Sequence, residues 1–201
     1  MAERDGFKRW LQGTGSACQN KDGAGSPARE TEACGHMDEG REAEIALGGW
    51  DRLGADAVRV RHQVFVLEQA VPPELELDGE DAACLHAVAY GAGGRPVGTG
   101  RLLPDGHIGR MAVLPGARGR GTGGRILRAL VEAGRRAGHA RLVLHAQIRA
   151  GGFYRAHGFV AEGEPFMEAG IEHCLMALDC TRPLVWESPG GNGEGRTTWP
   201  E

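Results

Sequence analysis

The middle of the chain carries two amphipathic patterns with the period of an α-helix. The first covers residues 53–67, where Val60, Val64 and Leu67 fall on one face. The second begins within a glycine-rich stretch and ends at about Ala137. Its apolar residues form one stripe, while mostly charged residues occupy the opposite side. The residues predicted to be buried on this second helix are Ile126, Leu127, Leu130 and Val131.

Short apolar runs before, between and after these helices predict β-strands. Two connections are turn sequences, GAGGRP and PDG, so the strands beside them are expected to pair as hairpins. The strand after the second helix completes a β-α-β unit, and hairpins combined with such a unit predict a mixed sheet in an α/β or α+β fold. The predicted strands cover about 43–47, 84–90, 97–103, 107–114, 141–147 and 171–178, with a short helix over 149–158.

Both ends of the chain lack this patterning. Residues 1–40 are rich in Gly, Ser, Ala and charge and contain few large apolar side chains, so burial cannot offset the entropy of ordering them. Residues 183–201 have the same character. We expect both segments to be disordered around one folded domain over 41–182. Met37 stands where the patterned sequence is about to begin, which leads to the hypothesis that it is the biological start.

Composition and charge restrict the function. With 201 residues, of which 41% are apolar, the chain has the size of one domain with tails. A net charge of −4 does not favour nucleic acid as a general partner. The charge is uneven, however, because residues 101–141 contain nine arginines and two acids, which favours a local anionic ligand. Arginines on the solvated faces of a glycine-rich chain are the alternative interpretation.

Cysteine, metal and membrane signals are weak. Five cysteines form an odd set without regular spacing, so no disulfide framework is predicted. Cys34 and His36 are similar to the start of a metal site, but no second pair follows, and no metal is expected. No apolar run approaches the ~18 residues of a membrane span, and the first residues lack the apolar core of a signal peptide. We therefore expect a cytoplasmic protein without a membrane partner.

The stretch LPGARGRGTGGRILRAL, residues 114–130, has the form of a phosphate-binding loop that leads into a helix. A P-loop would need a lysine, but Gly121 and Thr122 stand where Gly-Lys-Ser/Thr is required. A dinucleotide site would need an acid after the next strand, which ends instead in His-Ala-Gln, although G-x-G-x-x-G is present from Gly119. A third interpretation begins at Arg118, where RGRGTG matches R/Q-x-x-G-x-G/A.

Together with two further segments, this third pattern resembles the GCN5-related N-acetyltransferase (GNAT) family over about residues 42–180. MAVLPGARGRGTGGRIL is similar to the family's strand, pyrophosphate loop and helix. QIRAGGFYRAHGF is similar to its N-x-x-A-x-x-F/L-Y-x-x-x-G-F segment, with Gln147 where asparagine is more usual. VFVLEQ, the dipeptide AQ and GIEHCLM resemble the ElaA-like subgroup. The resemblance implies a mixed, twisted β-sheet flanked by helices.

The resemblance also implies acetyl-CoA as a co-substrate. Backbone N–H groups of a glycine loop at a helix N-terminus converge on an anion, and the helix dipole favours negative charge there. The residues expected to hold the pyrophosphate are Arg118, Gly119, Arg120, Gly121, Thr122 and Gly123. The pantetheine arm is expected beside the backbone of Met111, Ala112 and Val113, with Gln147 and Tyr154 completing the cofactor site.

Acetyl transfer from a thioester to an amine needs a base for the ammonium, a donor for the tetrahedral oxyanion and an acid for the departing thiolate. In the matching family segment the tyrosine lies beside the sulfur, so the resemblance implies that Tyr154 is the general acid. A phenol with an ordinary pKa of about 10 is still protonated at neutral pH. An aromatic anchor for a short helix is the alternative role of Tyr154.

The general base has several candidates. Glu68 ends the first helix, at the entrance that normally lines the acceptor pocket of this fold, and His173 lies on the last predicted strand. Both are predicted to be catalytic, with a solvated carboxylate and a structural histidine as the alternatives. His107, His145 and a water chain are further candidates. Arg110 occupies the region where some family members carry a glutamate base, so that arrangement is not expected.

The sequence thus predicts an acyltransferase that moves an acetyl group from acetyl-CoA to a primary amine by direct attack. Cys174 could form an acyl-enzyme, but no paired histidine and acid accompany it. The alternatives are a non-catalytic acyl-CoA-binding or sensor module of the same fold and a structural domain with an empty loop. The acceptor is a small-molecule or peptide amine. Dimerisation is common in such folds, and no residue pattern specifies a homodimer interface.

An acid-rich loop between the first helix and the second strand has two interpretations. It either attracts a cationic acceptor amine or is simply solvated. The acids of this loop are Glu74, Glu76, Asp78, Glu80 and Asp81.

Overall fold

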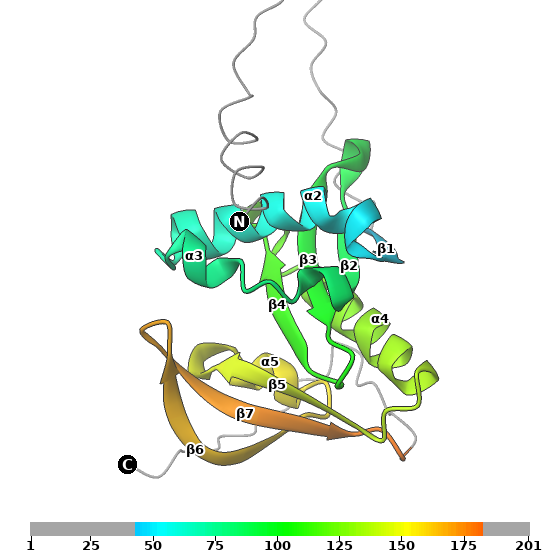
Figure 1. Ribbon diagram of the computed structural model, residues 1–201, viewed down its shortest axis with the longest axis vertical. Helices are drawn as coiled ribbons and strands as arrows, with labels where there is room; N and C mark the ends of the chain where they lie inside the picture. The colour runs from blue at the N-terminus through cyan, green and yellow to red at the C-terminus, as the bar shows by residue number, and fades with distance from the viewer. Residues whose placement is uncertain (1–42, 183–201) are drawn as a thin grey trace, which may run out of the picture. The chain divides into compact units, whose positions relative to one another are not determined.

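The computed structural model describes residues 43–182 (Figure 1). The predictions for residues 1–40, for a start at Met37 and for residues 183–201 lie outside the described residues, as does the pair Cys34 and His36. Within 43–182 the predicted strands and helices occur in the predicted order, with one additional strand near the end and a short helix, α3 (Pro73–Glu76), in the predicted acid-rich loop.

Four antiparallel strands form the first sheet, in the order β1–β2–β3–β4. They are β1 (Glu44–Gly48), β2 (Leu85–Tyr90), β3 (Pro96–Leu102) and β4 (Ile108–Val113). Val88 of β2 packs on Leu53 of helix α2 (Trp50–Arg61). Its neighbour Ala87 belongs to the cluster that contains helix α4 (Thr122–Arg136). Because adjacent residues of a strand face opposite sides, the two helices cover opposite faces of this sheet.

The second sheet has three antiparallel strands in the order β5–β7–β6. β5 (Arg141–Gln147) and β7 (Ile171–Asp179) match predicted strands, and helix α5 (Gly151–Arg155) is shorter than predicted. β6 (Val160–Glu168) is the additional strand. Its sequence, VAEGEPFME, shows neither an apolar run nor alternation, because it is an edge strand with mostly exposed side chains.

The two sheets meet where β4 and β5 lie in parallel. His107 and Val143 form a single parallel bridge, and the Val143 N–H donates to the Gly106 carbonyl at 3.1 Å. Beyond this bridge no ladder joins the two strands within the described residues. The predicted mixed α/β fold with flanking helices is confirmed, and the mixed character comes from two antiparallel sheets joined at one parallel contact.

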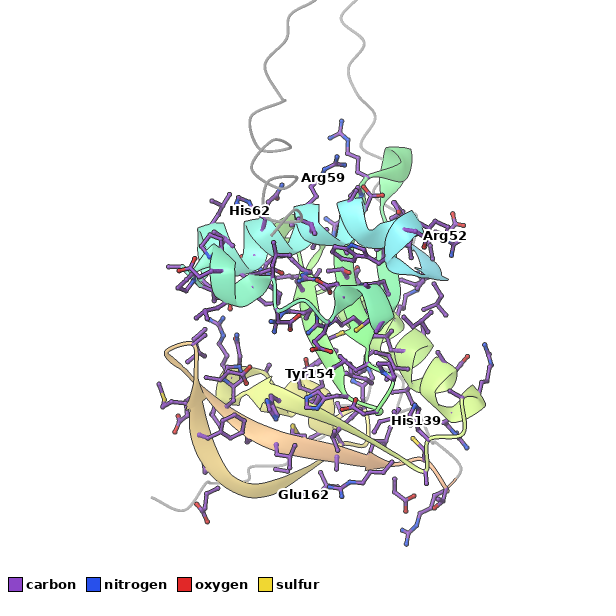
Figure 2. The ribbon with its side chains drawn as sticks, viewed as in Figure 1. Arg52, Arg59, His62, His139, Tyr154 and Glu162 are labelled. Atoms are coloured by element: carbon purple, nitrogen blue, oxygen red, sulfur yellow. The ribbon has the colours of Figure 1, made fainter. Side chains whose placement is uncertain are left out.

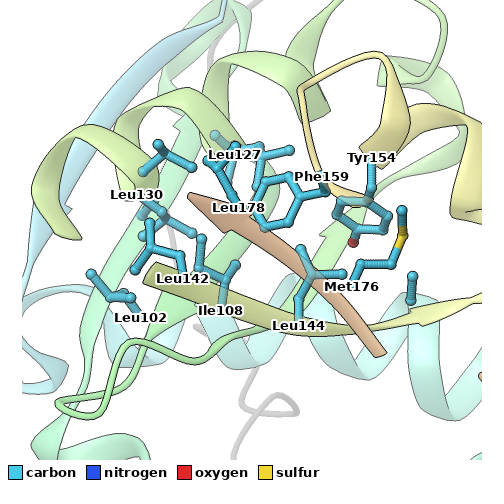
Figure 3. Close-up of a cluster of buried hydrophobic side chains, with 14 of the residues drawn as sticks. Leu102, Ile108, Leu127, Leu130, Leu142, Leu144, Tyr154, Phe159, Met176 and Leu178 are labelled. Carbon is cyan, nitrogen blue, oxygen red and sulfur yellow. The ribbon is translucent and has the colours of Figure 1, made fainter. Parts of the chain in front are cut away.

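The core connects α4 with both sheets (Figure 3). The four residues predicted as the buried stripe of α4 are all 0% exposed. They share the core with Leu142, Leu144, Phe159, Met176 and Leu178. The close approach of α4 to β3 requires a glycine, because a Cβ at Gly98 would lie 2.8 Å from Cδ1 of Ile126. The helix that begins at the glycine loop is therefore held tightly against the first sheet.

Helix α2 begins three residues earlier than predicted and passes directly into a π-helical segment over residues 62–68. The Gln69 N–H donates to the Val64 carbonyl at 3.1 Å, which is an i to i+5 hydrogen bond. Val60 and Val64 are buried as predicted, but Leu67 is 69% exposed, so its predicted place on the buried face is wrong. The wider π-helical turn rotates Leu67 away from the face that an α-helix would give it.

Candidate active site

A cavity of about 580 Å³ lies between β4 and β5. Its other walls come from the end of the π-helical segment, the acid-rich loop and the β6–β7 hairpin. The lining includes four predicted site residues, Met111, Gln147, Tyr154 and His173. Figure 2 shows the side chain of Tyr154 between the first sheet and the second. Neither Glu68 nor the glycine loop belongs to the lining, so the predicted residues separate into a cavity group and a loop group.

β4 is irregular beside the cavity. The β3–β4 register shifts between Thr99 and Arg101, and Arg110 has a φ of 51°. A bulge of this kind breaks the regular ladder and increases the local twist. β4 is also the outer strand of its sheet, so beyond the bridge its edge toward β5 has no ladder partner among the described residues. An extended molecule that carries amides can pair with such an edge.

The glycine loop forms the N-terminus of α4. Gly119 and Gly121 have φ values of 71° and 76°, which residues with a Cβ rarely adopt. A Cβ at either glycine would have no atom within 4 Å, so the space above the loop is open. Gly121 is the N-cap and no side chain caps the helix, while the Thr122 hydroxyl donates to the Ala117 carbonyl at 3.1 Å. The first N–H groups of α4 therefore fit an anion such as pyrophosphate.

Glu68 and Arg118 form an ion pair beside this loop. The two Nη atoms of Arg118 donate to Glu68 at 2.9 and 2.6 Å, and its Nε donates to the Val113 carbonyl at 2.8 Å. The hydrogen bonds from Arg118 lower the pKa of the Glu68 carboxyl. A carboxylate with a lowered pKa is a weaker general base. The structure thus pairs Glu68 with the loop rather than with the cavity, while Arg120 is exposed.

Tyr154 lies on α5 and forms part of the cavity wall, with 8% of the residue exposed. Phe153 and Phe159 meet its ring edge to face, with centroids 4.9 and 6.1 Å away. Burial raises the pKa of Tyr154 to about 12, so the phenol keeps its proton at neutral pH. The packing role and the proton-donor role are therefore compatible in one side chain.

His173 lines the cavity from β7 and is 8% exposed. Its Nδ1 lies 2.8 Å from the Ile171 carbonyl, so Nδ1 carries the hydrogen and Nε2 is left as the basic nitrogen. Phe166 of β6 stacks on the imidazole, with ring centroids 6.2 Å apart. His173 is therefore in the cavity but covered by an aromatic ring.

Two further histidines lie in the cavity wall. His145 of β5 and His107 meet edge to face with centroids 4.7 Å apart. The Nδ1 of His145 lies 2.9 Å from Oε2 of Glu168, which also lines the cavity. Burial lowers the pKa of His107, and the neighbouring His145 lowers it further. The cavity thus holds three imidazoles, one of which is paired with a carboxylate.

Gln147 bridges two walls of the cavity. Its Nε2 donates to Oε1 of Gln69 at 2.9 Å, and Nε of Arg149 donates to its Oε1 at 2.9 Å. Gln69 follows the π-helical segment, so the first of these hydrogen bonds ties the end of β5 to the end of that segment.

The structure corrects the solvated interpretation of the acid-rich loop for two of its acids and the amine-attracting interpretation for three. Glu76 and Asp81 are only 5% exposed, so they are not solvated. Arg61 of α2 binds both of these carboxylates, and Arg101 of β3 binds Asp78 and Asp81. Carboxylates that are already paired with arginine are not available to attract a cationic amine. The loop acids that remain exposed without such a partner are Glu74 and Glu80.

Arg110 completes this ionic cluster at the cavity wall. Its Nε donates to the Glu76 carbonyl at 3.2 Å, and its Nη2 donates to Oδ2 of Asp78 at 2.9 Å. Three arginines and three carboxylates therefore cancel in formal charge. Sequence reasoning missed the cluster, although one signal was present. Arg61 lies at helical spacing from two buried apolar residues, Ala57 and Val64.

The described cysteines do not form a nucleophilic site. Cys84, Cys174 and Cys180 are buried free thiols. Cys174 packs in the core with Met176 and does not line the cavity, and burial raises the pKa of its thiol. Among residues 43–182 no group of three or more His, Cys, Asp and Glu side chains is placed to hold a metal ion. No helix in the same range has the length and apolarity needed to cross a membrane.

Known proteins similar to this chain include named acetyltransferases. A family described as acetyltransferase (GNAT) domain matches residues 51–180. YjcF, an uncharacterized N-acetyltransferase of Bacillus subtilis, is 41% identical over 128 residues, which are 62% of this chain and 91% of the relative.

Two solved structures are also similar to this chain. An acyl-CoA N-acyltransferase from Pseudomonas aeruginosa has a TM-score of 0.61 and 28% identity, and the match covers 68% of this chain and 99% of the other. ElaA of Escherichia coli has a TM-score of 0.61 and 25% identity, with coverage of 68% and 99%.

Proposed function

The chain belongs to the GNAT acetyltransferase family and is an acyltransferase, and we propose that it transfers an acetyl group from acetyl-CoA to a primary amine. One observation carries the proposal. The free edge of β4 leads from the cavity to the uncapped N-terminus of α4. This path suits a long donor with an anionic end and an amide-bearing arm.

The donor lies along β4 in this proposal. Its pyrophosphate rests on the N–H groups of residues 119–123, where Gly119 and Gly121 leave open space. Arg120 is exposed and adds positive charge at the same end, whereas the charge of Arg118 is balanced by Glu68. The pantetheine amides pair with the backbone of residues 111–113, and Gln147 stands on the opposite strand.

The reaction is direct transfer within the cavity. The amine loses a proton to a base and its lone pair forms a C–N bond with the acetyl carbon. A backbone N–H at the β4 edge stabilises the oxyanion. The C–S bond then breaks, and Tyr154 gives its proton to the sulfur. The burial of Cys174 in the core supports direct attack over an acyl-enzyme.

The base in this proposal is a histidine of the cavity. Glu68 is bound by Arg118 and lies outside the cavity lining, whereas His173 lies within it. The acceptor is a small amine, because one cavity of about 580 Å³ must hold it together with the acetyl end of the donor.

Calorimetric titration with acetyl-CoA tests the donor site through a matched pair of variants, Gly121→Asp and Gly121→Asn. Both side chains tolerate the positive φ of this position, and they have nearly the same size but differ in charge and in the amide's N–H donors. A carboxylate beside the pyrophosphate is expected to weaken binding at least about tenfold relative to the amide. The difference between the two variants should shrink as salt is added.

Turnover is tested by the release of free CoA thiol from acetyl-CoA with a panel of small primary amines. Amine-dependent release by the wild type supports acetyl transfer. Binding of acetyl-CoA without release for any amine would leave the non-catalytic binding module. Equal affinity of the Asp and Asn variants would contradict the assignment of the loop.

A further inference from the structure

We propose that His145, oriented by Glu168, is the general base that takes the proton from the acceptor amine. This inference rests on the proposed acetyl transfer and identifies its proton acceptor. It differs from the sequence-based expectation, which favoured Glu68 and His173.

His145 lies on the strand that borders the gap. It precedes Gln147 by two residues, so both side chains project from the same face of β5, and both line the cavity. The parallel bridge at Val143 brings His145 about level with Gly109, and Gln147 about level with Met111. Two residues along a strand span about 7 Å, a distance that an imidazole and one water molecule can bridge.

His173 is farther from the donor path. In the second sheet it pairs with Gln147, so β5 stands between His173 and the gap. Phe166 also covers it, and the residue is 8% exposed. His145, in contrast, lines the cavity with a side chain that is 38% exposed.

Glu168 gives His145 the tautomer that a base needs. An ionised carboxylate only accepts hydrogen bonds, so the contact with Nδ1 at 2.9 Å requires the hydrogen on Nδ1. Nε2 then carries the lone pair. The ring is also fixed by Phe166, whose centroid lies 4.8 Å away. A carboxylate that orients a histidine and stabilises its cation is a recurrent arrangement in general-base catalysis.

The titratable groups around His145 are compatible with this role. Glu168 faces it from β6 and His107 from the residue before β4. Burial lowers the pKa of His107, so His107 stays neutral near pH 7 and does not repel a cationic His145. The other charged or titratable groups in or beside the cavity lining are Glu76, Asp78, Glu80, Arg101, Asp105, Arg110, Tyr154 and His173.

The proton balance of the step closes without a further reactant. The ammonium proton moves to Nε2 of His145, and the amine attacks the acetyl carbon. Tyr154 protonates the thiolate that leaves, and the imidazolium returns a proton to the phenolate through solvent. The products are an acetamide and free CoA thiol. The acceptor nitrogen loses a second proton as it becomes an amide, and this proton passes to solvent.

The test compares His145→Gln and Glu168→Gln with the wild type in the thiol-release assay, using the fastest amine of the panel and hydroxylamine. Alkylamines are protonated near pH 7, whereas hydroxylamine is mostly neutral, so its lone pair is free to attack without prior loss of a proton to a base. We expect His145→Gln to lower kcat/KM for the amine about 10²-fold or more and to remove the acidic limb of the pH profile. Glu168→Gln should cause a smaller loss and shift that limb, and hydroxylamine should react nearly as fast with both variants.

Two further variants serve as controls. His139→Gln changes a histidine outside the cavity lining and should keep the wild-type profile. His173→Gln should keep the acidic limb. An unchanged pH profile in His145→Gln, loss of the limb in His173→Gln instead, or an equal loss with hydroxylamine would overturn the inference. A wild type that binds acetyl-CoA but acetylates no amine would overturn the proposed function itself, which is a different result.

Discussion

The proposed proton donation by Tyr154 can be tested by a substitution that removes only the phenol oxygen. Tyr154→Phe keeps the ring that packs between Phe153 and Phe159 but removes the acid. We expect kcat to fall about 10²-fold or more, while the KM for acetyl-CoA changes little, because the lost proton acts on the leaving thiolate. Steady-state release of CoA thiol measures both constants.

The chain offers a matched control in its other tyrosine. Tyr90 donates to Asp56 at 2.7 Å on the first sheet and does not line the cavity. Tyr90→Phe should cost about 1 kcal/mol of stability and leave kcat unchanged. Equal losses of activity in the two variants would remove Tyr154 from the chemistry.

For single residues, the sequence predicted the positions that lie within a recognisable motif. The loop glycines and Tyr154 hold their places through the spacing of neighbouring residues, so their positions were predictable. The pairing of His145 with Glu168 joins two strands across 23 residues, and β6 carried no recognisable pattern. Arg118 was predictable at the loop, but its capture of Glu68 depends on where the π-helical segment ends.

The contact between β3 and α4 is the packing that fixes the glycine loop. Gly98→Ala would bring a Cβ to 2.8 Å from Ile126 and 3.3 Å from the Ala112 carbonyl. Ile126 is fully buried and cannot yield easily, so we expect a loss of about 1–3 kcal/mol in the free energy of unfolding. Urea denaturation measures this loss.

Gly152→Ala is the control for the same substitution without crowding. Gly152 lies in helix α5 and a Cβ there would meet nothing within 4 Å. Alanine should stabilise that helix slightly, by up to about 1 kcal/mol. If the Gly98→Ala variant were as stable as the wild type, α4 would not pack against β3 closely enough to require a glycine at this position.

Helices were predictable where their apolar residues repeat with a regular period. The stripe of α4 repeats every three to four residues without interruption, and all of its predicted core residues are buried. The pattern of α2 failed at Leu67 because the hydrogen bonding changes to i to i+5 there. The joint between the two sheets is a single bridge, and no local pattern encodes one contact between segments 36 residues apart.

At the scale of the whole molecule, the ionic cluster ties together elements that lie far apart in the sequence. Arg61 comes from α2 and Arg101 from β3, and Asp81 accepts hydrogen bonds from both, at 2.7 and 2.8 Å. Asp81→Asn would leave two buried guanidinium groups facing a neutral amide. We expect a loss of about 3–5 kcal/mol in unfolding free energy, whereas Glu74→Gln on the exposed part of the loop should stay within about 0.5 kcal/mol.

The same cluster predicts how stability depends on pH. Burial alone would raise the pKa of Asp78, but hydrogen bonds and charge from Arg101 outweigh it and hold that pKa at about 2, below its ordinary 3.8. The pKa of Asp81 is lowered by Arg61 and Arg101 in the same way. Because the unfolded chain binds these protons first, the stabilisation is complete above the ordinary pKa and is lost as the pH falls from 3.8 toward 2. Urea titrations across this window should therefore give a shallower fall for Asp81→Asn than for the wild type. Parallel curves would mean that Asp81 contributes nothing to acid unfolding.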